Sequence, residues 1–270
     1  MEWQYISSKS NSLVVRIAKL KDKKYRKAEG LFRFDGIKLF CEAANSGATI
    51  EYVFVNESAR EKYCTEVEAA CGSAKLYILA DEVFSKLTDE QSPEGIITVC
   101  SNLENITFEN DVNSLAKALK EKCVLILESV RDVGNMGTII RSARAFGIDA
   151  LVISSDCADL YNPKTVRAAM GALFVQRIVA IESIPSLVLA MRSAGARVFA
   201  AALQRDAKKL GEIELTKGDA ILIGNEGHGL SEEAISVCDE CVYIPMEEGS
   251  ESLNAGIAAS VCMWELYKIK

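Results

Sequence analysis

The chain has 270 residues, of which 49% are hydrophobic, and this is enough to build a substantial core in one or two domains. No stretch approaches the roughly 18 continuous apolar residues of a membrane span, and residues 1–12 lack the apolar region of a secretory signal. The nine cysteines are an odd number and lie mostly inside apolar runs, which is typical of small hydrophobic side chains in a reducing compartment. We therefore expect a globular cytoplasmic protein with no membrane partner.

The sequence gives little support for a metal site or for histidine-based catalysis. The only C-x-x-C pair is Cys238 and Cys241, and the chain has a single histidine, so there is no second ligand pair at zinc-like spacing. That histidine, His228, lies in the run GNEGHGL and is interpreted as a turn residue rather than a catalytic base. We expect no metal, and a single histidine excludes most catalytic-triad chemistry unless His228 itself takes part.

The net charge of −7 is unevenly spread along the chain. Residues 1–38 contain ten Lys or Arg and four Asp or Glu, so 10 − 4 = +6, and −13 remains for the rest. A basic segment on an acidic protein can bind phosphate locally by releasing counterions. Charge alone leaves a solvated helix face as an equal alternative.

The amino-terminal half is predicted to be a compact α/β domain. Apolar residues at Leu13, Val14, Ile17 and Leu20 predict an amphipathic helix over residues 12–27. Its charged face carries the candidate RNA contacts, which are Lys21, Lys23, Lys24, Arg26 and Lys27. Strands are then predicted at 31–34, 52–55, 75–79 and 95–100, alternating with helices at 36–45, 59–70 and 81–87.

Residues 101–122 turn polar and contain Asn-rich breaks, so the chain is divided into domains 1–106 and 107–270, with a short helix expected near the boundary. The second domain alternates strands and helices, which implies a mostly parallel sheet covered on both faces. The predicted strands are 123–129, 150–154, 175–181, 197–203, 220–224 and 241–246, and the predicted helices are 138–147, 163–172, 184–194, 231–237 and 253–267. Gly147 is a candidate helix C-cap.

The final stretch, residues 241–267, joins a strand, a polar loop and an apolar helix. Pro245 should end the strand or place it at an edge, and the loop EEGSES carries Gly249. Ser252 is the predicted N-cap of the helix. A polar loop between two apolar elements can hold a ligand, although an ordinary strand-to-helix connection is equally compatible with this stretch alone.

Three polar loops each follow a predicted strand, at the end where α/β sheets bind ligands. They are residues 131–137, 224–229 and 244–254. The first lacks the G-x-G-x-x-G spacing of a dinucleotide fingerprint, which disfavours a nicotinamide oxidoreductase. Glycines at 224, 227 and 229 allow close approach of the backbone to a ligand, and Glu226 offers a carboxylate beside them.

Taken together the loops resemble, in order and spacing, the motifs of the SpoU/TrmH (SPOUT-type) family of RNA ribose 2′-O-methyltransferases. The matching runs are DVGNMGTIIRSARAFGIDAL, ILIGNEGHGLS and YIPMEEGSESLNAGIAASV, and the resemblance covers residues 123–268. The run DLYNPKTVRAAMGALF is similar to the family's linking segment. The first domain, especially EGLFRFDGIKLFCEA, more loosely resembles the RNA-binding domain of the family's ribosomal RNA branch.

The resemblance implies a small N-terminal α/β RNA-binding domain followed by a C-terminal parallel-sheet α/β domain with a trefoil knot. It also implies S-adenosylmethionine as cofactor and a homodimer. By position, the implied cofactor-binding residues are Gly224, Glu226, Ile244, Met246 and Leu253. The implied catalytic residues are Arg141, Asn135, Glu226, Ser252 and Asn254.

The implied reaction is the attack of a ribose 2′-hydroxyl on a sulfonium methyl group, in which positioning should dominate. Arg141 is the family's proposed base, but an arginine is effectively always protonated, so we favour a positioning role. Ser252 and Asn254 would orient the ribose or hold Arg141, while Asn135 would fix the first loop; helix capping by Ser252 and turn formation by Asn135 are the structural alternatives. Large-subunit ribosomal RNA is the expected substrate. The alternatives are tRNA, or a non-catalytic RNA-binding or ribosome-assembly protein of the same fold.

Overall fold

The structure is a computed structural model that describes residues 2–247, 249 and 252–269. Glu248, Ser250 and Glu251 of the predicted polar loop therefore lie outside the described residues. Contacts divide the chain into two compact units. Unit 1 comprises Met1–Glu104 and Asp159–Phe174, and unit 2 comprises Asn105–Ala158 and Val175–Lys270.

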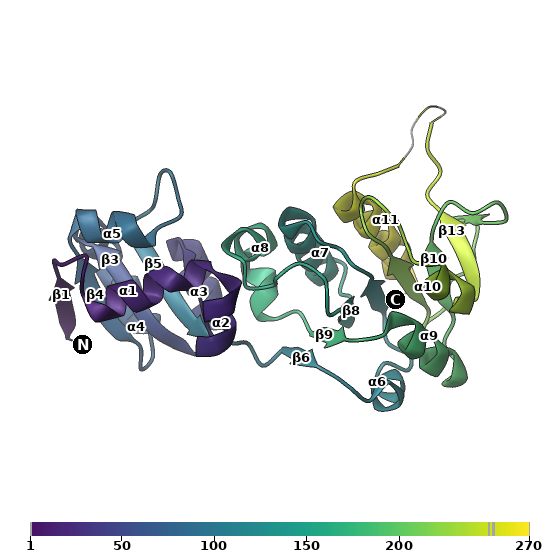
Figure 1. Cartoon of the computed structure of the whole chain (residues 1–270), viewed down its shortest axis with the longest axis horizontal. Coiled ribbons are helices and arrows are strands. Elements are labelled where there is room, and N and C mark those ends of the chain that lie inside the picture. The colour runs from purple at the N-terminus through teal and green to yellow at the C-terminus, as the bar shows by residue number, and fades with distance from the viewer. Residues whose placement is uncertain (1, 248, 250–251, 270) are drawn as a thin grey trace. The chain divides into compact units, whose positions relative to one another are not determined.

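Unit 1 is built on a five-stranded mixed sheet with the order β1-β4-β3-β5-β2, in which β5 runs antiparallel to β2 and β3 (Figure 1). Its strands are β1 (Trp3–Ile6), β2 (Leu31–Asp35), β3 (Ile50–Asn56), β4 (Lys75–Leu79) and β5 (Ile96–Ser101). Its helices are α1 (Ser12–Ala18), α2 (Lys23–Glu29), α3 (Ile37–Asn45), α4 (Glu57–Ala70), α5 (Asp81–Leu87) and α8 (Pro163–Ala169), with 3-10 turns η1 (Lys19–Lys21) and η2 (Met170–Phe174). Strand β1 was absent from the sequence prediction.

The amphipathic helix predicted over residues 12–27 is broken into three pieces. The apolar stripe is confirmed, because Val14, Ile17 and Leu20 are fully buried in the core of unit 1. The prediction of one helix is wrong, because Asp22 has an extended backbone (φ −94°, ψ 131°) between η1 and α2. This break turns the basic residues that follow Asp22 onto a separate short helix.

Residues 159–174 pack with unit 1, which differs from the single boundary expected after residue 106. The ring of Tyr161 lies 4.6 Å from that of Phe32, and the ring of Phe174 lies 5.4 Å from that of Phe34. The Tyr161 hydroxyl also accepts a hydrogen bond from the Leu103 amide at 2.8 Å. Aromatic burial of this kind explains why the segment belongs with unit 1, although it connects two strands of the other sheet.

Unit 2 contains an eight-stranded sheet whose pairs are all parallel, in the order β11-β13-β10-β12-β7-β8-β9-β6. Its strands are β6 (Ile106–Phe108), β7 (Val124–Leu127), β8 (Ala150–Ser154), β9 (Ile178–Ile181), β10 (Val198–Ala201), β11 (Lys208–Lys209), β12 (Ala220–Ile223) and β13 (Glu240–Tyr243). Its helices are α6 (Val112–Ala118), α7 (Val133–Ala145), α9 (Ile184–Ser193), α10 (Glu232–Val237) and α11 (Ala255–Tyr267).

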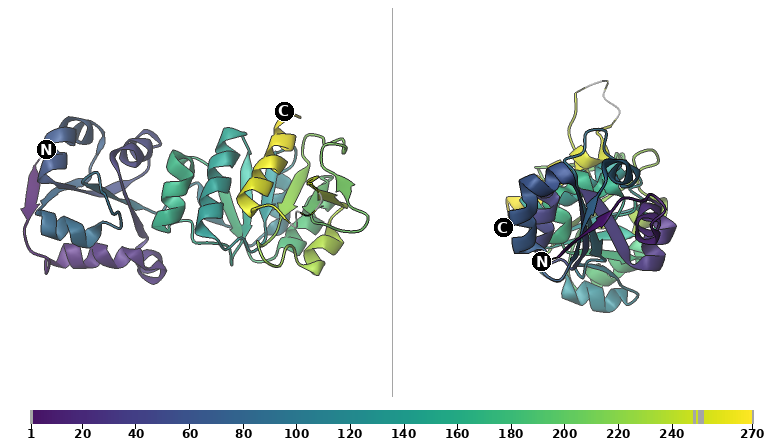
Figure 2. Two further views of the ribbon diagram at one scale, coloured as in Figure 1. Left: turned by 90° about the horizontal axis from the view of Figure 1, so that it is seen from above. Right: turned by 90° about the vertical axis from the view of Figure 1, so that its left-hand side faces the viewer.

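Helices cover both faces of this sheet, as predicted. On one face, buried residues of α6, α9 and α10 form a single core with the strands, for example Leu115, Leu187 and Ala234. Helices α7 and α11 lie side by side on the other face (Figures 1 and 2), where the hydroxyl oxygens of Ser142 and Ser260 are 2.9 Å apart. Burial on both faces explains why the strands are near-continuous apolar runs.

Candidate active site

The three predicted loops meet at the carboxyl-terminal edge of the parallel sheet in unit 2. They follow β7, β12 and β13, and within the sheet β12 lies between β7 and β10, with β13 on the far side of β10. In parallel sheets the carboxyl ends of all strands lie at the same edge, and ligands bind there. The convergence of the loops is therefore a consequence of the strand order.

The first loop is shorter than predicted, because α7 begins at Val133 rather than near residue 138. The side chain of Asp132 caps the helix by accepting a hydrogen bond from the Asn135 amide at 2.7 Å. Asn135 thus lies in the first turn of α7, and only 9% of it is exposed. The cap fixes the direction in which the Asn135 side chain leaves the helix.

Asn135 joins the second and third loops. Its Nδ2 donates to Glu226 Oε1 at 2.9 Å, and its Oδ1 accepts from Asn254 Nδ2 at 2.8 Å. The carboxylate of Glu226 also lies 3.3–3.4 Å from the backbone amides of Arg131 and Asp132, at the N-terminal end of α7. A helix N-terminus favours negative charge, so the carboxylate lies in a suitable field. We call the chain of contacts through Glu226, Asn135 and Asn254 the polar relay.

The second loop is a tight turn that requires glycine. Asn225 and Gly229 pair across it, and Asn225 Oδ1 accepts from the amides of Gly227 and His228 at 2.8 and 3.1 Å. A Cβ at position 224 would overlap the backbone of Gly229, so only glycine fits. His228 is part of this turn, as predicted.

A cavity of about 530 Å³ lies between the second and third loops. All five predicted cofactor residues line it, together with Ser252. Its apolar wall comes from the ends of β12 and β13 and from α11, through residues such as Ile223, Val242 and Ala258. A further part of the wall is formed by residues 201–204, at the end of β10 and in the loop after it, which the sequence interpretation missed. The position of that loop directly after an apolar strand was the signal that could have found it.

The predicted helix cap in the third loop is wrong. The N-cap of α11 is Asn254, whose Oδ1 accepts from the amides of Gly256 and Ile257 at 2.9 and 3.3 Å. Ser252 is exposed and lies two residues earlier, at the cavity. Asn254 therefore caps the helix with one side-chain atom and contacts Asn135 with the other, and the hydroxyl of Ser252 is not used for capping.

Arg141 stands apart from the polar relay. It lies on the exposed side of α7, and its side chain forms no hydrogen bond or ion pair with any residue that the structure describes. Asn135, Glu226 and Asn254 are therefore brought into direct contact, whereas Arg141 is not bonded to them within one chain. Its guanidinium is available to a group from outside the chain.

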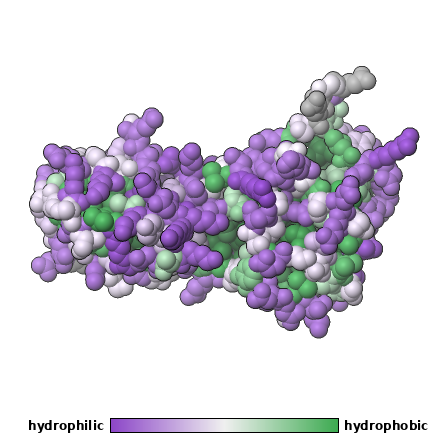
Figure 3. Space-filling view, in the orientation of Figure 1, coloured by the Kyte–Doolittle hydropathy of each residue, from purple (hydrophilic) through white to green (hydrophobic). Residues whose placement is uncertain are grey.

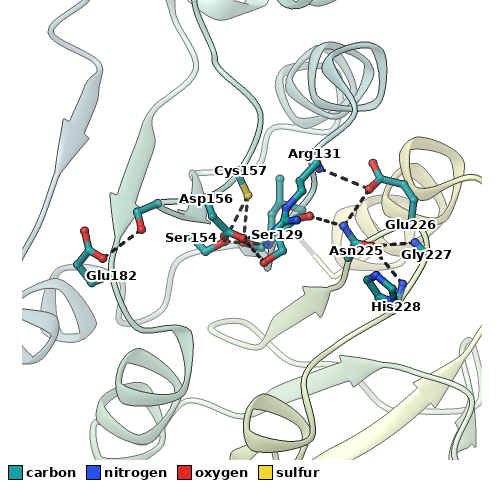
Figure 4. A network of polar contacts seen from close by, with 12 residues as sticks. Ser129, Arg131, Ser154, Asp156, Cys157, Glu182, Asn225, Glu226, Gly227 and His228 are labelled. Atoms are coloured by element: carbon teal, nitrogen blue, oxygen red, sulfur yellow. Dashed lines mark hydrogen bonds and ion pairs between the residues drawn. The ribbon is translucent and has the colours of Figure 1, made fainter. Parts of the chain in front are cut away.

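A second polar network borders the first loop (Figure 4). Ser129 has a left-handed backbone (φ +54°), which costs about 1–3 kcal/mol for a residue other than glycine. The carboxylate of Asp156 accepts hydrogen bonds from Ser129 Oγ at 2.6 Å, Ser154 Oγ at 2.7 Å and Arg131 Nη2 at 2.8 Å. Burial acts to raise the pKa of Asp156, but these hydrogen bonds and the charge of Arg131 outweigh it and lower the pKa to about 2.

Four of the five predicted RNA contacts in unit 1 are exposed, and their role in RNA binding stays a prediction. Lys21, Lys23, Lys24 and Lys27 are exposed and form no ion pair with a described residue. Figure 3 shows mostly hydrophilic residues over the part of unit 1 that carries α2. These four lysines are called the lysine quartet.

Arg26, the fifth predicted RNA contact, is not on the surface. It is only 4% exposed, and its Nη1 donates to the carbonyls of Leu20 and Lys21, both at 2.6 Å. Its Nη2 pairs with Asp159. The guanidinium therefore holds the break between η1 and α2 and is not an exposed RNA contact.

Two structural findings concern membranes and metals. Within the part of the chain that the structure describes, no helix combines the length and apolar character needed to cross a membrane. Over the same residues, no three His, Cys, Asp or Glu side chains are grouped so as to hold a metal ion.

These features define an α/β protein with a ligand cavity at the carboxyl edge of a parallel sheet. A glycine turn forms part of the cavity wall, and the polar relay connects the three loops. Comparison with known proteins narrows this class. The model of the SpoU rRNA Methylase family matches residues 122–264, and that of the MRM3-like substrate binding domain matches residues 11–98. The chain belongs to the SpoU rRNA methylase family.

Similar proteins span nearly the whole chain. The 23S rRNA (guanosine(2553)-2′-O)-methyltransferase RlmP of Bacillus subtilis is 33% identical, covering 97% of this chain and 98% of the relative. An AdoMet-bound rRNA methyltransferase from Sinorhizobium meliloti superimposes with a TM-score of 0.83 at 25% identity, covering 98% and 97%. The methyltransferase AviRb from Streptomyces viridochromogenes, in complex with AdoMet, gives 0.79 at 26% identity, covering 96% and 97%.

Proposed function

We propose that this chain is an S-adenosylmethionine-dependent enzyme that methylates a ribose 2′-hydroxyl in large-subunit ribosomal RNA. The family, the near full-length likeness to a 23S rRNA 2′-O-methyltransferase and the two cofactor-bound structural neighbours support this reading. The observation that carries it is the polar relay, because Glu226, Asn135 and Asn254 connect the three motifs and Glu226 lines the cavity. Ribosomal RNA is preferred over tRNA on the names of the relatives.

The cavity fits the proposed cofactor. Its volume of about 530 Å³ lies within the range of small-ligand sites. Ile223, Ile244 and Leu253 offer apolar surface for a flat base, and the glycine turn brings backbone close to the ligand. When bound, S-adenosylmethionine supplies an electrophilic methyl group on its sulfonium. Gly224, Glu226, Ile244, Met246 and Leu253 are the residues proposed to hold it.

The polar residues are proposed to position the ribose. Ser252 presents an exposed hydroxyl at the cavity, and the Asn254 amide is held in place by Asn135. Asn135 also fixes Glu226, so that a shift of one member moves the other two. Preorganisation of this kind contributes to rate because the reacting groups need not be ordered during the reaction.

Arg141 is proposed to hold the ribose oxygen or an adjacent phosphate rather than to remove the proton. A guanidinium remains protonated and offers a planar fork that matches phosphate geometry. Its exposure and its lack of partners among the described residues leave that fork available to RNA.

We propose a homodimer in which α11 supplies the contact. Ile257, Trp264 and Tyr267 are 51%, 46% and 47% exposed on this helix, and Figure 3 shows apolar surface in that part of unit 2. An exposed apolar patch of this kind marks an interface. In sedimentation experiments Trp264→Asp should shift the protein to monomer. The control Leu189→Asp, at a similarly exposed position on α9, should leave it dimeric. A dimer that survives Trp264→Asp would contradict this assignment.

The RNA contacts, the chain topology of unit 2 and the cellular location are also proposed. The lysine quartet is proposed to bind RNA phosphates, within the region that matches a substrate-binding domain model. A trefoil knot is proposed in unit 2, supported by the likeness to solved SpoU methyltransferases. A cytoplasmic location is supported by the buried thiols of Cys100, Cys157 and Cys262, which suit a reducing compartment.

Calorimetry on the whole chain tests the cofactor assignment. S-adenosylmethionine should bind with one site per chain, and NAD should give no heat. Transfer of a labelled methyl group should then be faster to deproteinised large-subunit rRNA than to tRNA. Binding of NAD alone would refute the cavity assignment, and a preference for tRNA would replace the substrate while leaving the chemistry in place.

A further inference from the structure

Asp156 lies two residues beyond β8 and does not line the cavity, yet its carboxylate organises the first loop. Oδ1 accepts from Ser154, and Oδ2 accepts from both Ser129 and Arg131 (Figure 4). Charge-assisted hydrogen bonds are stronger than neutral ones, and here three converge on a single side chain. Asp156 is thus the common acceptor for donors from two strand ends.

The first connection from Asp156 to the cavity runs through Ser129. The strained backbone of Ser129 is held on two further sides, because its amide donates to Ser154 Oγ at 2.8 Å and its carbonyl accepts from Asn225 Nδ2 at 2.7 Å. Asn225 in turn organises the glycine turn that walls the cavity. A left-handed residue persists only where its surroundings over-determine it, so loss of the Asp156 contact should let this backbone relax.

The second connection runs through Arg131. Its side chain is tied to Asp156, while its backbone amide and that of Asp132 face the Glu226 carboxylate at 3.4 and 3.3 Å. These contacts are at the long end of the hydrogen-bond range. A displacement of the loop by a few tenths of an ångström would therefore break them and release Glu226 at the cavity wall.

We propose that Asp156 is a positioning residue for the cofactor cavity, acting through Ser129 on Asn225 and through Arg131 on Glu226. The inference rests on the proposed function in one respect, that the ligand of the cavity is S-adenosylmethionine. Asp156 touches neither the ligand nor the RNA in this account. Its removal should weaken cofactor binding and leave RNA binding intact.

The chain offers a matched control at the end of the neighbouring strand. Glu182 follows β9 and accepts one hydrogen bond from Ser155 Oγ at 3.1 Å, and it has no hydrogen bond to the first loop (Figure 4). Asp156→Asn and Glu182→Gln each remove one carboxylate charge beside a strand end. Only the first weakens an acceptor shared by Ser129 and Arg131, because it removes the charge of that side chain.

The test uses full-length protein and calorimetric Kd values for S-adenosylmethionine, with RNA affinity and Tm measured on the same samples. Asp156→Asn should raise the cofactor Kd by about ten-fold, because small misplacements in a site cost about that much or more. Its RNA Kd should stay within about two-fold of wild type, and Glu182→Gln should match wild type throughout. Ser129→Ala, which removes a single hydrogen bond, should raise the cofactor Kd in the same direction by less.

The route is tested by a double-mutant cycle. If Asp156 acts partly through Asn225, the effect of Asp156→Asn on the cofactor Kd should shrink in an Asn225→Ala background. An unchanged cofactor Kd in both Asp156→Asn and Ser129→Ala, with only a lower Tm, would overturn the inference and leave Asp156 a stabilising surface residue. If wild type and Glu182→Gln fail to bind S-adenosylmethionine, the cavity assignment fails instead.

Discussion

Two regions of the molecule differ in whether their polar side chains are bonded to other side chains of the chain. At the carboxyl edge of the sheet in unit 2, Asn135, Glu226 and Asn254 are bonded to one another. In the lysine quartet of unit 1, and at Arg141, the side chains are exposed and have no partner among the described residues. The difference indicates two tasks: groups bonded within the chain hold a geometry, and unpaired cations are available to the phosphates of a substrate.

Among these variants, loss of the unpaired Arg141 side chain should lower the rate of methyl transfer most. Arg141→Ala should lower methyl transfer by about 10³-fold or more, because it removes a charge from the reaction site. The Kd for the cofactor should not change, since Arg141 does not line the cavity. Single-turnover rates with labelled cofactor and calorimetry measure the two quantities.

Arg141→Lys separates the two roles of this residue. A lysine can lose a proton when it is desolvated but cannot reproduce the planar fork. Appreciable rescue with a shifted pH profile would favour general-base action, and no rescue would favour positioning. Near wild-type turnover in Arg141→Ala would contradict both and favour a non-catalytic RNA-binding protein.

Replacing Asn135 should have a different effect from replacing Arg141, because Asn135 is bonded to two other side chains and its loss disturbs both. Asn135→Ala breaks the contacts to Glu226 and Asn254, and should lower kcat/KM by about 10- to 100-fold. The cofactor Kd should rise as well, in contrast to Arg141→Ala. The free energy of unfolding should fall by about 1–3 kcal/mol, since two polar partners lose their bonds. A change in kcat without any change in cofactor Kd would show that the relay does not support the cavity.

The lysine quartet should govern RNA affinity and its salt dependence. Replacing Lys21, Lys23, Lys24 and Lys27 by Ala should weaken RNA binding about ten-fold or more and reduce the salt slope by up to about 3, as expected for the loss of phosphate contacts. Lys117, Lys120, Lys122 and Lys217 form a matched set of exposed lysines in unit 2, and their replacement should change little. An equal loss in both sets would indicate a general charge effect rather than a defined surface.

The smallest expected effect concerns acid stability. The pKa of Asp156 is about 2 in the folded protein, below the value of roughly 4 for an unfolded chain, so its contribution is fully present above pH 4 and is lost as the pH falls toward 2. The group is 44% exposed, so after screening we expect about 1 kcal/mol. Asp156→Asn should therefore be less stable than wild type at pH 7 and equal to it near pH 2, as followed by circular dichroism. A constant difference across this range would contradict the lowered pKa.

The sequence was sufficient for the features that depend on local pattern. Apolar runs separated by polar loops predicted the parallel sheet of unit 2, and the position of the three loops after strands predicted that each lies at the ligand-binding end of the sheet. The resemblance to a known family supplied the residue roles. The shared edge follows from strand direction alone, because the carboxyl ends of parallel strands lie at one edge, whereas the strand order that makes the loops neighbours came from the structure.

The sequence predictions failed mainly at residues whose role depends on a contact with a residue far away in the sequence. Arg26 lies in a basic run, and no local pattern shows that it pairs with Asp159, 133 positions later. Asp156 was missed because two of its three donors, Ser129 and Arg131, belong to a different strand end. Ser252 and Asn254 are both good helix caps, so propensity could not choose between them, and the contact to Asn135 is made by the residue that caps.

Methyl transfer to a ribose 2′-hydroxyl is best tested by locating the transferred methyl group in the RNA. Purified full-length protein is incubated with methyl-labelled S-adenosylmethionine and deproteinised large-subunit rRNA, and the RNA is then hydrolysed with alkali. Alkali needs a free 2′-hydroxyl to cleave, so the label should remain in alkali-resistant dinucleotides, and Arg141→Ala should give none. Label released entirely as mononucleotides would show methylation of a base and would contradict the account.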